Sequence, residues 1–168
     1  MLESIKEFMK LHSTLIDKMF KDLGEVRPMI VLMGENEEGC QVKPVIVPSM
    51  FYQNELGKMF LKSVILKKEI DELKSEGYEF RCVSFCSECW MKKITINSEG
   101  VNIEKDIEVV VVSYEMKGNS LFHVYEIKRN MNVSEDGLME EPSLELYKEI
   151  TNTENVQFEG MMTNLFTE

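Results

Sequence analysis

Three of the four cysteines, Cys82, Cys86 and Cys89, lie within eight residues, directly before the only tryptophan, Trp90. Thiolates at such short spacing are the usual ligands of iron–sulfur clusters and of zinc. If residues 78–90 form one strand, Cys82 and Cys86 lie about 13 Å apart on one face, at ~3.3 Å of rise per residue, and Cys89 points to the other face. Thiolates that share a zinc ion through bonds of ~2.3 Å cannot be that far apart. We therefore expect all three thiols to pack without a metal or cofactor, and a small zinc-binding protein remains an alternative.

A second group of chemically capable residues lies in the last predicted hairpin. Asp106 and Glu108 open a valine-rich strand, and Glu126 and Lys128 lie on the strand that follows. Residues 105–129 thereby resemble the core of the PD-(D/E)xK nuclease superfamily. In that superfamily an acid on one strand and a Glu-x-Lys on its neighbour complete a magnesium site that activates water for phosphodiester hydrolysis. The resemblance implies that Asp106 or Glu108 binds the metal together with Glu126, while Lys128 stabilises the developing charge.

The register of this hairpin decides whether those side chains can meet. If Met116 pairs with Ser120, Lys128 lies opposite Glu108, which is also the arrangement of an ordinary cross-strand ion pair worth ~0.2–1 kcal/mol. A register shifted by one residue pairs Glu108 with Arg129 instead. In both registers the charged residues can be explained as ordinary cross-strand ion pairs, without catalysis. A divalent-metal-dependent nuclease is therefore kept only as an alternative function.

Other catalytic motifs are absent from the sequence. It contains no phosphate-binding loop, no dinucleotide fingerprint and no His-Glu-x-x-His zinc motif. The two histidines, His12 and His123, lie 111 positions apart, so a serine-protease triad has no local support. We interpret both as residues of the core or its rim, and we expect a protein without catalytic activity.

Apolar residues at three- and four-residue intervals predict two amphipathic helices. The first covers residues 2–23 and ends at Gly24, and the second covers residues 50–76 and ends at Gly77. A single face of the second helix is expected to contain Leu56, Met59, Phe60, Ser63, Val64, Lys67, Ile70 and Leu73.

The segments between and after the helices predict strands. Two apolar runs around a glycine-bounded loop indicate a hairpin over residues 28–48, and Pro44 places its second strand at an edge or a bulge. A strand follows over residues 78–90, whereas residues 91–105 are polar and predict an irregular segment. The hairpin over residues 108–129 contains four consecutive valines, which indicate a strand covered on both faces. The order α-β-β-α-β-β-β predicts an α+β fold with a largely antiparallel sheet of about five strands packed against two helices.

The length of 168 residues and the 43% hydrophobic content predict one globular domain over residues 1–168. No apolar run approaches the ~20 residues that cross a bilayer. The first ten residues mix charges into their apolar positions, unlike a secretory signal. We therefore expect a cytoplasmic protein with reduced thiols and no membrane partner.

The net charge of −11 is concentrated at one end of the chain. Residues 131–168 contain nine acids and one base, and among the 19 basic residues of the whole chain only three are arginine. A nucleic-acid partner is therefore not expected. We predict that this acidic segment docks on the domain, with a short helix over residues 143–150, and that its apolar side chains are candidates for binding a protein partner: Phe158, Met161, Met162, Leu165 and Phe166. Homodimerisation through a sheet edge is a further expectation.

A broader resemblance joins the strand end around Trp90 to the hairpin strand over residues 124–129. This Ser-Glu-x-Trp strand end, followed by Val-Tyr-x-Ile-x-Arg, is similar to a group of small bacterial and phage α+β proteins to which no activity is assigned. The resemblance implies a fold pattern and a phage or bacterial source. From these observations we expect a non-catalytic protein-interaction or regulatory module.

Overall fold

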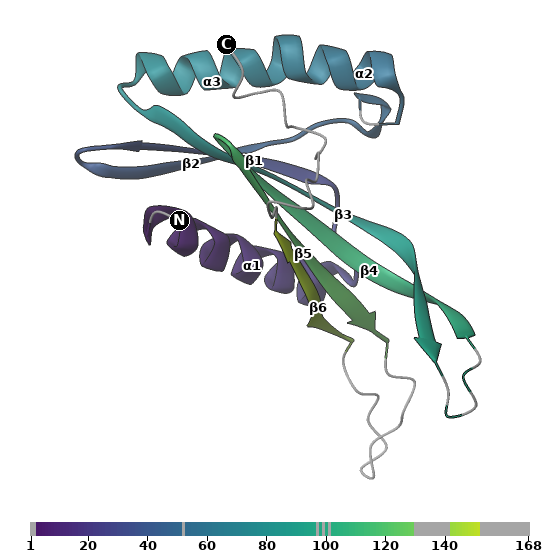
Figure 1. Ribbon diagram of the computed structural model, residues 1–168. Coiled ribbons are helices and arrows are strands. Elements are labelled where there is room, and N and C mark those ends of the chain that lie inside the picture. Colours follow the sequence, from purple (N-terminus) through teal and green to yellow (C-terminus); the bar gives the residue numbers. More distant parts are fainter. Residues whose placement is uncertain are drawn as a thin grey trace.

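The protein is an α+β fold built on a six-stranded antiparallel sheet in the order β2-β1-β3-β4-β5-β6, which confirms the predicted class (Figure 1). The computed structural model describes residues 3–51, 53–96, 98, 100, 102–129 and 142–151, without the side chains of 94–96, 102, 103 and 151. The elements are α1 (Glu3–Leu23), β1 (Met29–Asn36), β2 (Gly39–Val45), η1 (Ser49–Phe51), α2 (Glu55–Phe60), η2 (Leu61–Leu66), α3 (Lys67–Ser75), β3 (Glu79–Ile96), β4 (Asn102–Met116), β5 (Asn119–Lys128) and β6 (Ser143–Thr151).

Helix α1 covers one face of the sheet (Figure 1). Its apolar positions recur every three or four residues, so they form one stripe that is buried along the whole helix: Ile5, Phe8, Met9, His12, Ile16 and Phe20. These side chains pack against inward-facing residues of the central strands, including Val31, Cys86, Val112 and Tyr114. Gly24 ends the helix with a φ of +71°, a conformation that glycine adopts without steric cost.

Segments α2, η2 and α3 follow one another directly and form a second helix on the other face (Figure 1). Its buried side chains, Leu61, Leu66, Ile70 and Leu73, belong to one cluster with Ile30, Leu32 and Val83 of the sheet. The ammonium group of Lys43 on β2 lies 2.6 Å from Glu69 and 2.5 Å from Glu72, so ion pairs hold the α3 end of this helix against the edge strand. Pro44 also lies on β2, the edge strand, as predicted.

Strand β3 runs far beyond the predicted end at Trp90 and pairs with β4 as far as Ile96 and Asn102. The prediction of an irregular segment is therefore wrong for residues 91–96 and 102–105. Polar residues occupy this part of the hairpin because both of its faces carry exposed side chains, such as Lys92 and Glu104, which form an ion pair of 3.0 Å across the strands. The predicted central position of the valine strand is confirmed, since β4 lies between β3 and β5.

A β-bulge changes the faces of β3 near its start. Met33 pairs with Cys82, but the next residue of β1, Gly34, pairs with Phe80, so that Arg81 is the extra residue. Phe80 therefore packs with the cluster under the second helix, whereas Cys82 faces α1. An uninterrupted strand over residues 78–90 would place Phe80 and Cys82 on one face, and the bulge breaks this alternation.

The predicted helix over residues 143–150 is a strand, β6, which pairs with β5 along its length. Cross-strand pairing with Leu121–Lys128 supplies hydrogen bonds and burial that outweigh helix propensity. This strand is the sixth of the sheet and its second edge. Of the acidic segment over residues 131–168, only residues 142–151 are described.

Candidate functional site

The second helix carries an apolar stripe on its outer side. Leu56, Met59, Phe60 and Val64 are 78, 65, 45 and 48% exposed. Their spacing of three, four and eight residues places them on one side of a helix. We call these four residues the outer stripe. The helix thus has two apolar sides, because Leu61, Leu66, Ile70 and Leu73 on its other side are buried.

The π-helical segment η2 produces this division. Hydrogen bonds from residue i to i+5 place an extra residue in the turn, so the side chains that follow are rotated backwards around the axis relative to a continuous α-helix. The predicted single face that joins Leu56 to Ile70 and Leu73 is therefore wrong. Leu56 lies on the outer side, while Ile70 and Leu73 contact the sheet.

The start of the second helix is fixed by local contacts. The side chain of Asn54 accepts a hydrogen bond of 2.8 Å from the backbone N–H of Gly57, as expected of an N-cap residue. A β-carbon at Gly57 would lie 2.7 Å from the carbonyl oxygen of Met50, so glycine permits the close approach of helix and η1. The rings of Phe51 and Phe60 stack with centroids 5.5 Å apart. These contacts hold the outer stripe in a defined orientation.

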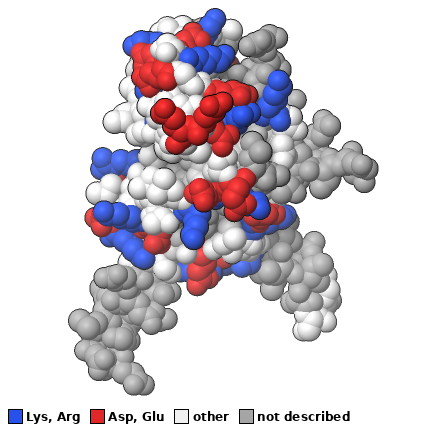
Figure 2. All heavy atoms as spheres, turned by 90° about the vertical axis from the view of Figure 1, so that its left-hand side faces the viewer, with Lys and Arg blue, Asp and Glu red and all other residues white. Residues whose placement is uncertain are grey.

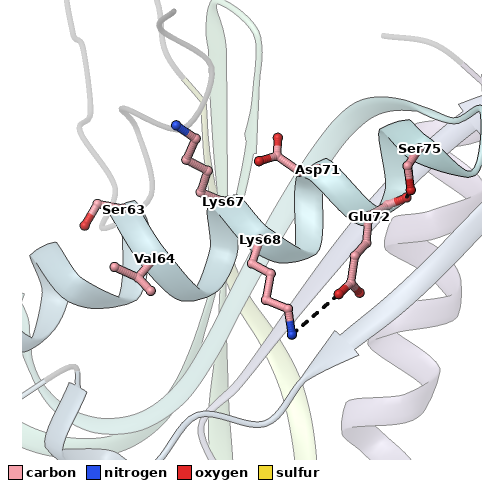
Figure 3. A pocket seen from close by; sticks show the side chains of 7 residues that line it. All are labelled: Ser63, Val64, Lys67, Lys68, Asp71, Glu72 and Ser75. Atoms are coloured by element: carbon pink, nitrogen blue, oxygen red, sulfur yellow. Dashed lines mark hydrogen bonds and ion pairs between the residues drawn. The ribbon is translucent and has the colours of Figure 1, made fainter.

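The outer stripe continues into a polar groove of about 490 Å³ on the same side of the helix. Val64 belongs to both, and the groove is lined by Ser63, Val64, Lys67, Lys68, Asp71, Glu72 and Ser75 (Figure 3). Lys68 and Glu72 face one another with 3.5 Å between the charged atoms. An apolar surface and a charged groove thus lie end to end along one helix.

Charge is distributed unevenly along the sequence of the second helix. Residues 55–68 contain four lysines (58, 62, 67 and 68) and one acid, Glu55, whereas residues 69–75 contain three acids and one lysine. A hydrogen bond from Lys58 lowers the pKa of the Glu55 carboxyl group. Figure 2 views the end of the molecule where β1 joins β2, and it shows acidic side chains gathered there and mixed charges over the second helix above them. The outer stripe therefore lies in the more basic half of the helix.

The structure separates the three clustered thiols. Cys82 and Cys86 are buried under α1, where burial raises the pKa of Cys82 to about 12 and that of Cys86 to about 11. Cys89 is exposed and lies opposite Val109, on the other face. Within the described residues, no group of three His, Cys, Asp or Glu side chains is arranged to hold a metal ion. Cys82 and Cys86 are protonated near neutral pH and pack as small apolar residues.

The hairpin has neither of the two registers considered from the sequence, and it differs by one residue from the first of them. Met116 pairs with Asn119 rather than with Ser120, so Glu126 lies opposite Val109. A slip of one residue moves a side chain to the other face of the sheet. Glu108 consequently points to the α1 side, while Glu126 points to the side of the second helix.

Each of the candidate carboxylates on these strands has its own environment. Glu108 accepts two hydrogen bonds from Arg129, at 2.7 and 2.8 Å, and these lower its pKa. Glu126 accepts a hydrogen bond from Lys128 on its own strand, with 2.6 Å between the charged atoms, and this lowers its pKa too. Asp106 is exposed on the same side as Glu108. The structure therefore does not bring Glu126 together with Asp106 or Glu108, as a shared metal ion would require.

His123 belongs to a polar network that the sequence could not indicate, because its members are far apart in the chain. His123 contacts Glu149 at 2.9 Å and the Tyr125 hydroxyl at 3.2 Å, and that hydroxyl contacts Ser13 of α1 at 3.1 Å. The network connects β6, β5 and α1. A pocket of about 270 Å³ adjoins Ser13 and Tyr125.

His12 is buried behind this network. Neither of its ring nitrogens has a hydrogen-bond partner among the described residues, and burial lowers its pKa to about 4. Its ring stacks on Phe8 and meets the edge of Tyr114 at centroid distances of 5.8 and 5.7 Å. The expectation that both histidines lie in the core or at its rim agrees with their burial.

The candidate partner-binding residues Phe158, Met161, Met162, Leu165 and Phe166 lie outside the described residues. Across the part of the chain that is described, no helix is both long and apolar enough to cross a membrane. Comparison with protein-family models, with curated proteins and with solved structures finds no match to the chain.

The class defined by fold and site is an α+β protein with an outward-facing apolar stripe beside a charged groove. Apolar periodicity alone did not indicate the outer stripe, because it places Leu56 on the same face as the buried Ile70 and Leu73. One signal was present: Leu61, Ile65 and Leu66 are also apolar, so residues 56–66 contain more apolar side chains than one helical face can hold.

Proposed function

We propose that the protein is a non-catalytic protein-interaction module and that the outer stripe is its contact surface. The observation that carries the proposal is the exposure of four large apolar side chains in a row on one helix. Contiguous apolar surface of this kind is uncommon on proteins that act alone, and it commonly marks an interaction site. Single exposed apolar residues elsewhere need no such explanation.

The way the stripe is built supports this function. The second helix has a separate buried side, so exposure of the outer stripe is not the result of a missing core. The N-cap at Asn54, the close approach at Gly57 and the stacked Phe51 hold the stripe in place before a partner arrives. A surface that is already ordered loses less conformational entropy on binding. Met59, together with the exposed Met50 nearby, adds flexible side chains that adapt to a partner's shape.

The geometry lends no comparable support to the nuclease alternative. Asp106 and Glu108 lie on one face of the sheet and Glu126 on the other, and Glu108 and Glu126 are engaged in ion pairs there. A two-faced arrangement of this kind offers no common point at which a metal ion and a phosphodiester could meet.

The proposal is tested by selecting peptides of 16 random residues on the full-length protein. We expect enriched peptides to contain several apolar residues and to bind through the stripe. A double variant, Leu56→Glu with Met59→Glu, should weaken binding at least tenfold, because contact residues of this size dominate interface energies. The control is Leu15→Glu, at an exposed leucine of α1, which should leave affinity unchanged. Thermal unfolding by circular dichroism checks that each variant is folded. Peptides that bind wild type and double variant equally well would place the contact surface elsewhere.

A further inference from the structure

We propose that β3 pairs with β3 of a second copy of the chain, antiparallel about Met91, so that two sheets join where this strand extends beyond β1. The proposal concerns a different surface from the outer stripe and does not rest on it. It is carried by a free strand edge, by an exposed tryptophan on that edge, and by charges that leave one register open.

Within the described residues, the far half of β3 has a strand neighbour on one side. Pairing with β1 ends at Cys86, whereas β4 continues beside β3 to the end of the strand (Figure 1). The loop before β1 reaches two residues further, where the backbone N–H of Val26 donates to the Glu88 carboxylate. We call residues 89–96 the free edge. Backbone N–H and C=O groups along such an edge are a template for pairing with another strand.

The free edge carries Trp90, which is 72% exposed. Tryptophan is enriched among the residues that dominate interface energies, because its large ring buries much apolar area. Met91, the next residue, packs against a small cluster that contains Ile107 and Val109. A ribbon of two strands is marginally stable by itself, so strand addition at this edge would stabilise the ribbon and also cover Trp90.

Symmetry and charge leave one register. Two copies related by a two-fold axis pair antiparallel, with one residue opposite its own copy at the axis. With Trp90 at the axis, the end of β3 of the other copy would reach the level of Cys86, where β1 begins. With Lys92 or Lys93 at the axis, each lysine faces its own copy, and like charges directly opposite are destabilising. Met91 at the axis avoids both problems.

The other edge of the ribbon, on β4, fits a second copy less well. Among the described residues, pairing of β4 with β5 begins at Val109, so the residues before it also lie at an edge. An axis at any residue from 104 to 106 places a charge opposite its own copy, and an axis at Ile107 places Asp106 opposite Glu108. Like charges therefore disfavour this edge in every such register.

The register about Met91 also gives Trp90 a favourable neighbour. Trp90 of each copy lies opposite Lys92 of the other, so the pair occurs twice. Lys92 is exposed, and an ammonium group over an indole ring is the most favourable kind of cation–π contact. On the other face of the strand, Cys89 lies opposite Lys93 of the other copy. The pairing thus covers five residues, from Cys89 to Lys93.

Sedimentation velocity of the full-length protein tests whether the dimer forms. Five residue pairs make a small interface, so we expect weak association, with the dimer fraction rising between about 10 µM and about 500 µM. Trp90 is the only tryptophan, so its emission should shift to shorter wavelength over the same range as the ring leaves water. A chain that stays monomeric at about 500 µM, or a dimer without this shift, would overturn the proposal.

Two substitutions at Trp90 test which residue lies opposite it. Trp90→Lys brings two lysines together across the interface, whereas Trp90→Glu places a carboxylate opposite Lys92. Both remove the ring, and we expect Trp90→Lys to dimerise at least tenfold more weakly than Trp90→Glu at 50 mM NaCl. General repulsion between two chains of net charge −11 would give the opposite order, since Trp90→Glu adds a further negative charge. Equal affinities or the opposite order would contradict the register. Circular dichroism checks that both variants are folded.

Disulfide cross-linking tests the axis itself, in protein whose two exposed thiols are removed by Cys40→Ser and Cys89→Ser. With diamide as the oxidant, Met91→Cys should give a cross-linked dimer. The matched control is Asp106→Cys, at an exposed position on β4, and it should give none. Equal yields, or a dimer from the control alone, would overturn pairing through β3.

A last variant separates this inference from the proposed function. Leu56→Glu with Met59→Glu alters the outer stripe and should leave the dimer unchanged. Loss of the dimer in that variant would place the second copy on the outer stripe and overturn the proposal. Peptide binding to the outer stripe does not involve the free edge, so it should persist in Trp90→Lys.

Discussion

The two helices on opposite faces of the sheet have similarly spaced apolar residues, but they differ in whether these residues are buried or exposed. Helix α1 is one uninterrupted α-helix of 21 residues, and its stripe from Ile5 to Phe20 is buried throughout. In the second helix Leu56, Met59, Phe60 and Val64 are exposed, whereas Leu61, Leu66, Ile70 and Leu73 reach the sheet. The difference shows that apolar periodicity locates a helix but does not decide what its apolar side contacts. A single π segment separates an exposed apolar surface from a buried one.

The helices also differ in how they are attached to the sheet. Polar contacts hold α1 in its middle and at its end, through Ser13 with Tyr125 and through Arg129 with the carbonyl oxygen of Gly24. Among the described residues, the ion pairs that tie the second helix to the sheet lie near Glu69 and Glu72, while its first turns are held by η1. The half that carries the outer stripe is thus attached through η1 and through the buried side chain of Leu61.

The largest expected effect is on the free energy of unfolding, and it distinguishes substitutions on the two sides of the second helix. Leu61→Ala removes a fully buried side chain, so we expect the free energy of unfolding to fall by ~2–5 kcal/mol. Leu56→Ala, the same substitution five residues earlier at an exposed position, should change it by less than ~0.5 kcal/mol. Urea unfolding at pH 7 measures both. Equal losses would mean that Leu56 is also part of the core and that the outer stripe is not free for a partner.

A second prediction concerns the stability of α1 against acid. Burial lowers the pKa of His12 from an ordinary value near 6.5 to about 4, so the unfolded chain binds a proton more readily than the folded one. The contribution of neutral His12 to the free energy of unfolding is fully present above about pH 6.5. It decreases as the pH falls and is lost once the pH passes below about 4. The difference of about 2.5 pKa units corresponds to about 3 kcal/mol.

The variant His12→Leu isolates this contribution. Carboxylates such as Glu108, whose pKa is lowered in the fold, also lose stabilising contacts in acid, but they do so in wild type and variant alike. The difference in unfolding free energy between the two proteins should therefore shift by about 3 kcal/mol in favour of the variant between pH 7 and pH 4. A pH-independent difference would show that His12 is solvated or hydrogen-bonded in solution.

Local sequence patterns predicted the helices and strands whose apolar residues keep one regular spacing and face one buried side. Helix α1, the hairpin of β1 and β2, and the central valine strand β4 have apolar positions that match one period and one buried side. The order of elements then led to the α+β class. Alternation also predicted that Cys89 lies on a different face from Cys82 and Cys86, which the register of β3 and β4 confirms.

Three shifts of one residue could not be predicted, and the first of them decides the candidate site. The π segment turns Leu56 outwards, the bulge at Arg81 reverses the face of Phe80, and the two-residue turn at Lys117 and Gly118 moves Glu126 away from Glu108. A pattern read with a fixed period of 3.6 or 2 contains no sign of such an extra residue.

The smallest expected effect compares the polar contacts that hold the two helices. Arg129 makes a bidentate ion pair with Glu108 and reaches Gly24 at the end of α1, and Lys43 bridges Glu69 and Glu72 of α3. Both cations are partly exposed, so solvent screening limits each contribution to about 1 kcal/mol or less.

Replacement of Arg129 or Lys43 by methionine keeps the apolar stem and removes the charge. The loss of unfolding free energy in each variant therefore measures the electrostatic contribution of that cation alone. The Lys92→Met variant, which breaks an exposed pair with Glu104, is the control and should cost almost nothing. We expect Arg129→Met to cost more than the control, because its guanidinium group also bonds a helix-terminal carbonyl oxygen. Amide exchange in the last turn of α1 should rise in Arg129→Met and stay unchanged in Lys43→Met. If exchange rises equally in both, the helices are coupled through the sheet, and the outer stripe would then respond to changes at α1.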